Sequence, residues 1–302
     1  MFKIYRNQGK DRLISILEIK GNDDESYAKL NLENGGSLME LRLDNFTIIK
    51  DLSPLLYKNT FASSILFPFA SRIKNGEYMF LNTLYRLPIN EVEKQNAIHG
   101  LVYNKTFKVI AQSTTNNKGQ VTLEYKQEEI INGFPFKFSL QLIYVLSKDN
   151  LTLEIKVKNQ DIQSFPFSIG WHPYFCSSDL YQSIVTLNSH KKIGFDENEI
   201  AVSEVKNSNV GEIKIKNKRF DDCFVLNDSK VQFKTPDFTL NIDSSSDENY
   251  LIVYTINEEN VIAIEPLSAA PNCFNTKKGL KILEPNAEYG MTMKIDIITD
   301  NH

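Results

Sequence analysis

The sequence predicts an all-β protein, a large antiparallel β-sandwich with few short helices. Three observations carry this prediction: apolar residues recur at every second position, turn-forming residues separate these segments, and no clear amphipathic helix exceeds two turns. Alternation with a period of two places one face of a strand in the core and the other in water. Many short strands with frequent turns are typical of a sandwich.

Taken in chain order, residues 121–125 and 136–144 alternate first, and residues 151–158 and 291–295 repeat the pattern. Each segment predicts a strand with one buried face. Turn signals such as Lys118-Gly119 and Asn132-Gly133 lie between or beside them. A short helix is expected at 90–94.

The chain has 302 residues, and neither a linker, a composition shift nor an internal repeat divides it. Because an all-β sandwich of this length can be one unit, we predict a single catalytic domain over residues 1–302. The sequence leaves open whether this domain is a monomer or a homodimer.

Composition excludes several classes of function. The net charge of -4 provides no basic surface for nucleic acid. The first residues do not resemble a signal peptide, and no run approaches the roughly 18 apolar residues of a membrane span. Cys176, Cys223 and Cys273 form neither a disulfide framework nor a zinc-binding spacing. We therefore expect a cytoplasmic protein without nucleic-acid or membrane partners.

His172 lies in the apolar and aromatic run Phe165–Cys176, next to the only tryptophan of the chain. An imidazole in such a run either satisfies both nitrogens locally, as a core histidine does, or faces a cavity. Pro173 favours an extended conformation at His172, so its ring should project from a strand end or from the turn beyond it.

A second histidine, His99, lies in a small and apolar setting, and Gly100 after it permits close approach of a ligand or of backbone. The run Val261–Glu265 reads as a buried strand that ends on a carboxylate and is stopped by Pro266. A buried carboxylate must be paired or must titrate upward, and raised basicity suits a general base.

Two further candidates could bind a ligand. Arg72 follows an aromatic segment, and its planar guanidinium group is suited to donating hydrogen bonds to hydroxyls or a phosphate. Asp221 and Asp222 form an acidic pair within an apolar frame, where one carboxylate could accept hydrogen bonds from vicinal hydroxyls. Since the nucleotide-binding, zinc-protease and serine-hydrolase motifs are absent, we expect a site without a cofactor.

In these residues the sequence resembles the aldose 1-epimerase, or mutarotase, family, including its bacterial galactose mutarotase and hexose-6-phosphate mutarotase relatives. The matching pieces are FPFASRIKNGEYMF (67–80), NAIHG (96–100), IGWHPYF (169–175), FDDCF (220–224) and AIEPLSAAPNCFN (263–275). The family often has asparagine before the motif arginine, where this chain has Ser71.

The resemblance implies a galactose mutarotase-like sandwich that interconverts the α and β anomers of an aldose or aldose 6-phosphate. It also implies that His172 is the general acid, that Glu265 is the general base, and that Arg72, His99 and Asp221 bind the sugar, with Asp222 a close second for the aspartate. Two alternatives stay open: a non-catalytic carbohydrate-binding sandwich, and a metal site formed by His99, His172 and Glu265.

Overall fold

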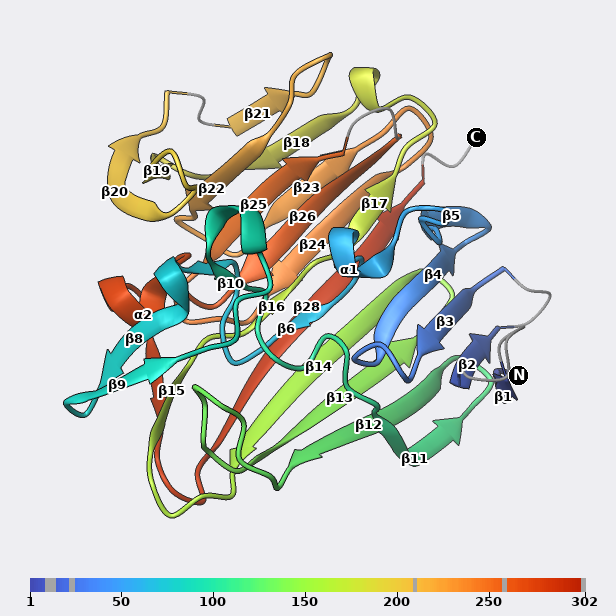
Figure 1. The fold of residues 1–302 in the computed structure, drawn as a ribbon. Coiled ribbons are helices and arrows are strands. Elements are labelled where there is room, and N and C mark those ends of the chain that lie inside the picture. Colours follow the sequence, from blue (N-terminus) through green and yellow to red (C-terminus); the bar gives the residue numbers. More distant parts are fainter. Residues whose placement is uncertain (9–14, 22–24, 209–210, 257–259, 300–302) are drawn as a thin grey trace.

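The computed structural model describes residues 1–8, 15–21, 25–208, 211–256 and 260–299. Within these ranges the strands form three large antiparallel sheets and three two-stranded ones (Figure 1). Two of the large sheets, of nine and eight strands, pack against each other, and the third is built from the N-terminal strands.

The nine-stranded sheet contains all four segments whose alternation is clearest in the sequence. Its strands in spatial order are β11 (Lys108–Thr114), β12 (Gly119–Gln127), β13 (Phe138–Leu146), β14 (Asn150–Asn159), β28 (Glu288–Ile298), β24 (Thr239–Ser244), β23 (Val231–Lys234), β18 (Ile184–Leu187) and β21 (Gly211–Lys214). The predicted strands are therefore neighbours, β12 to β14 and then β28. Their alternate apolar side chains face one common core.

The eight-stranded sheet positions the candidate site. Its strands in order are β20 (Ala201–Lys206), β19 (Lys191–Phe195), β22 (Asp221–Val225), β25 (Tyr250–Thr255), β26 (Val261–Leu267), β16 (Gly170–Trp171) and β6 (Ile65–Leu66), and β17 (Tyr174–Cys176) also pairs with β26. Phe175 and Phe224 of this sheet enter the same core as Phe233 and Leu240 of the nine-stranded sheet. One face of the eight-stranded sheet is thus the core, and the opposite face is available for a site.

The remaining elements are short or N-terminal. The five-stranded sheet contains β1 (Lys3–Gln8), β2 (Ser15–Lys20), β3 (Tyr27–Asn31), β4 (Ser37–Leu43) and β5 (Phe46–Ile49). The two-stranded sheets are β7 (Arg72–Ile73) with β10 (Ala97–Ile98), β8 (Glu77–Phe80) with β9 (Thr83–Arg86), and β15 (Phe165–Phe167) with β27 (Lys281–Leu283). The helices are α1 (Tyr57–Thr60), α2 (Cys273–Thr276) and the 3₁₀ turns η2 (Lys74–Gly76), η3 (Val92–Lys94) and η4 (Leu180–Gln182).

This architecture confirms the predicted fold class, an antiparallel β-sandwich with few short helices. The helix expected at 90–94 is the single 3₁₀ turn η3. None of the helices in the described ranges has the length and apolar character that crossing a bilayer requires. Cys176, Cys223 and Cys273, which all lie within the described ranges, form no disulfide bond.

Candidate active site

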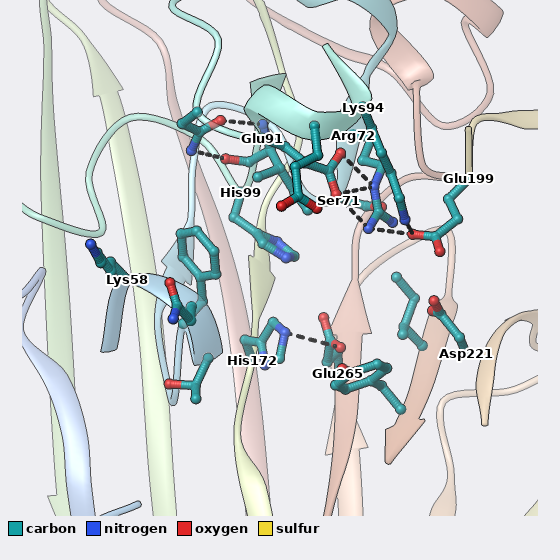
Figure 2. A pocket seen from close by; sticks show the side chains of 18 of the residues that line it. Lys58, Ser71, Arg72, Glu91, Lys94, His99, His172, Glu199, Asp221 and Glu265 are labelled. Atoms are coloured by element: carbon teal, nitrogen blue, oxygen red, sulfur yellow. Dashed lines mark hydrogen bonds and ion pairs between the residues drawn. The ribbon is translucent and has the colours of Figure 1, made fainter. Parts of the chain in front are cut away.

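A cavity of about 450 Å³ lies on the face of the eight-stranded sheet that points away from the sandwich core. Strands β22, β25 and β26 form its floor. Its walls come from α1, the segment 90–99, the β16–β17 junction and the β19–β20 turn (Figures 1 and 2). The volume falls in the range of small-molecule pockets. All five predicted site residues line it, namely Arg72, His99, His172, Asp221 and Glu265.

His172 occupies the break between β16 and β17, as Pro173 after it predicts. Its backbone is fixed on the neighbouring segment, because its N–H donates to the carbonyl of Ser64 (3.1 Å) and its own carbonyl accepts from the N–H of Ser63 (2.8 Å). The residue as a whole is 5% exposed. His172 thus lies outside the strand pairing, and its buried imidazole lines the cavity.

Glu265 lies within β26, opposite Ile252 of β25, and is 1% exposed. The expectation that Pro266 stops this strand is wrong, because β26 continues to Leu267. The N–H of Ile264 donates toward the carbonyl of Pro173, so the nitrogen two residues later points to the same side, into the gap between β16 and β17. A proline fits there because no ladder partner needs its missing N–H.

The imidazole of His172 and the carboxylate of Glu265 face each other across 3.4 Å, from Nε2 to Oε1 (Figure 2). The second oxygen of Glu265 and the Nδ1 atoms of His172 and His99 are buried, and none has a hydrogen-bond partner among the described residues. Buried polar atoms are normally paired. Three orphaned atoms around one cavity therefore indicate a polar ligand with several hydrogen-bonding groups.

His99 contacts His172 edge to face, with ring centroids 5.0 Å apart. Its backbone is left-handed, with φ of 60°, and its N–H donates to the carbonyl of Ser71. Gly100 is also left-handed, and a Cβ there would lie 2.2 Å from the carbonyl oxygen of Phe67. The close approach that glycine permits is therefore to backbone, and it fixes His99 beside His172.

Arg72 is the centre of an ion-pair cluster at the rim of the cavity. Its Nε and Nη2 donate to the carboxylate of Glu91 over 2.9–3.0 Å, and its Nη2 also contacts Glu199 at 2.5 Å. Lys94 pairs with the same oxygen of Glu199. The cluster joins η3 to the β19–β20 turn (Figure 2).

The acidic pair on β22 divides between two sides of the strand. Asp221 lines the cavity, whereas Asp222 forms an ion pair with Lys192 at 2.9 Å. Successive side chains of a strand point in opposite directions, which explains the division. Of the two aspartates, Asp221 is thus the one placed to meet a ligand in the cavity.

Burial controls the protonation of the central pair. It raises the pKa of Glu265 well above its ordinary value, with a smaller contribution from the charge of Asp221. It also lowers the pKa of His172 to about 4 and the pKa of His99 well below its ordinary value. Both shifts favour uncharged forms, so burial favours a neutral pair with its one titrating proton on Glu265, and a neutral His99.

No three histidine, cysteine, aspartate or glutamate side chains within the described ranges are arranged to hold a metal ion. His99, His172 and Glu265 share the cavity, but their arrangement is not that of a ligand set. The metal-site alternative therefore has no support from this geometry.

The sequence did not single out Glu91, Lys94 and Glu199. All three are charged residues in loops or turns, where such residues are usually solvated, and no local pattern distinguishes them. Only the pairing of β7 with β10 and the position of the β19–β20 turn bring them to Arg72.

Comparison with known proteins agrees with this fold. The model of the aldose 1-epimerase family matches residues 24–296. The uncharacterised protein YihR of Escherichia coli is 26% identical over 273 residues, which span 86% of this chain and 87% of that protein.

Two solved structures show the same fold. A galactose mutarotase-like protein from Clostridium acetobutylicum superimposes with a TM-score of 0.89 at 20% identity, over 99% of both chains. A galactose 1-epimerase from Lactobacillus acidophilus gives a TM-score of 0.83 at 16% identity, over 100% of this chain and 99% of that one. The fold and the sequence match together show that this chain belongs to the aldose 1-epimerase family.

Proposed function

We propose that the protein is a mutarotase, an isomerase that interconverts the α and β anomers of an aldose or aldose 6-phosphate. The observation that carries this proposal is the pair of His172 and Glu265, which are 3.4 Å apart in a cavity large enough for one sugar. Family membership supports the reaction class.

The reaction needs one acid and one base at adjacent oxygens of the sugar. Glu265 takes the proton of the C1 hydroxyl while His172 protonates the ring oxygen, and the hemiacetal opens. Rotation about the C1–C2 bond presents the other face of the carbonyl, and the ring closes with the two roles reversed. Each proton-transfer group typically contributes about 10²–10⁴-fold to the rate. The other cavity residues bind hydroxyls: Arg72 as donor, neutral His99 as donor or acceptor, and Asp221 as acceptor.

The proton of the pair changes place during this cycle. Ring opening requires an ion pair, with Glu265 ionised and His172 protonated, whereas burial favours the neutral pair. Sugar hydroxyls that donate to Glu265 stabilise its ionised form, and the charge of Arg72 acts in the same direction. Sugar binding thus prepares the ion pair from which ring opening proceeds.

The proposal is tested by polarimetry with freshly dissolved α-anomers of common hexoses and by exchange NMR with their 6-phosphates. We expect catalytic acceleration of anomer exchange for at least one sugar. Sugar binding with anomer exchange at the buffer rate would instead support a non-catalytic carbohydrate-binding protein.

The pH profile provides an independent prediction. Activity requires one proton on the pair, so it is lost on the acid side when His172 is also protonated, near its pKa of about 4. On the alkaline side it is lost when the pair gives up its last proton, at the raised pKa of Glu265. We expect kcat/KM, corrected for the buffer reaction, to be constant between these limits. An acid limb near 6.5, the ordinary pKa of histidine, would contradict the assignment of His172.

A further inference from the structure

Arg72 is held by its partners on two sides of the guanidinium. Glu91 accepts from Nε and Nη2 together, which is the bidentate arrangement that fixes the plane of an arginine. Glu199 contacts Nη2 as well. Within the described ranges no bond of Nη1 to protein is found, so the donors left for a ligand are those of Nη1.

Glu91 is itself fixed more firmly than a surface carboxylate. Its Oε2 accepts from the Nδ2 of Asn96 at 3.0 Å, and the backbones of the two residues form a β-bridge. Asn90 next to it donates to the carbonyl of Ile98 and accepts from the same residue's N–H. Contacts within the segment 90–98 thus hold Glu91 in place directly before His99.

Glu199 contributes less to this arrangement. It contacts a single nitrogen of Arg72, shares its oxygen with Lys94, and is 37% exposed, whereas the side chain of Glu91 is 18% exposed. Ion pairs weaken with exposure because water and salt screen them. Glu91 is therefore the partner that determines where Arg72 points.

We propose that Glu91 is a positioning residue for sugar binding: its bidentate pair fixes the guanidinium of Arg72 so that Nη1 meets the sugar hydroxyls. The proposal rests on the mutarotase function proposed above, since it assigns the cavity to a sugar. Glu91 itself does not touch the sugar in this account. It acts through Arg72 alone.

The test is Glu91→Gln, with Glu77→Gln as the matched control. Glutamine keeps the size of the side chain, but it loses the charge and one of the two oxygens that accept from the guanidinium of Arg72. We expect KM to rise about tenfold or more and kcat to change less than about threefold, because binding is lost equally in the ground and transition states. Glu77 pairs with Arg86 outside the cavity, at 2.8 Å from Nε to Oε1, so Glu77→Gln makes the same change to an arginine partner and should leave KM within about twofold.

A double-mutant cycle with Arg72→Ala separates positioning from a general structural effect. Arg72→Ala should raise KM, and adding Glu91→Gln to it should raise KM little further, because the two residues act as one unit. Additive effects of the two substitutions, or an unchanged KM in Glu91→Gln, would overturn the proposal. Thermal unfolding of each variant identifies any loss of fold, and Glu91→Asp, which keeps the charge, should recover part of the affinity.

Wild-type turnover separates this inference from the function on which it rests. If the wild type binds a sugar but does not exchange its anomers, the mutarotase function fails, and the same cycle measured as Kd by calorimetry still tests Glu91. If the wild type neither binds nor converts any sugar of the panel, both proposals fail.

Discussion

Glu265→Gln should lower kcat by about 10²–10⁴-fold, the range typical for loss of a proton-transfer group. The amide has the same shape as the carboxyl group but cannot take the proton of the C1 hydroxyl or return it. KM should change less than kcat, because the amide oxygen still accepts a hydrogen bond. Anomer exchange followed by polarimetry or NMR gives both constants.

This loss should not come from unfolding. Since burial raises the pKa of Glu265, the folded state binds more protons than the unfolded state above about pH 4.5, and this carboxyl group lowers the stability as the pH rises. Glutamine removes that penalty. The melting temperature of Glu265→Gln at pH 8 should therefore equal or exceed that of the wild type. Equal kcat for the two proteins would reject Glu265 as the base.

His172→Asn should reduce kcat to a similar extent, about 10²–10⁴-fold, because asparagine cannot protonate the ring oxygen. The neighbouring His99 does not replace it, since its ring centroid lies 5.0 Å from that of His172 and the imidazole nitrogen that faces Glu265 belongs to His172. The acid limb that His172 produces should also disappear from the pH profile of the remaining activity.

The matched control is His190→Asn, which makes the same change at an exposed histidine outside the cavity. It should retain wild-type kcat and KM. A His172→Asn variant as active as His190→Asn would show that the imidazole of His172 is not the acid.

The strands could be predicted where one face is exposed to solvent and the other is buried. Leu151, Leu153, Ile155 and Val157 alternate with polar residues because β14 has a solvated outer face, and that contrast is visible in the sequence. β26 behaves differently, since every residue from Val261 to Leu267 is buried. Its period is hidden, and the end that the sequence predicts, Glu265, is two residues too early.

The candidate site was predictable in its members but only partly in its geometry. His172 and Glu265 are recognisable because a titratable group within an apolar run needs a partner or a ligand. Their meeting depends on β17 pairing with β26 over a separation of almost 90 residues, which no local pattern encodes. Glu91 and Glu199 could not be predicted at all, because charged loop residues look alike until the loops are placed.

The central claim is that one imidazole and one carboxylate act on neighbouring oxygens of a single sugar ring. The most direct test is a crystal structure of Glu265→Gln with the aldose that the wild type converts fastest. We expect a pyranose in the cavity, with its C1 hydroxyl within about 3.2 Å of the residue 265 side chain and its ring oxygen equally close to Nε2 of His172. A sugar bound elsewhere, or bound with C1 and the ring oxygen away from both side chains, would contradict the account.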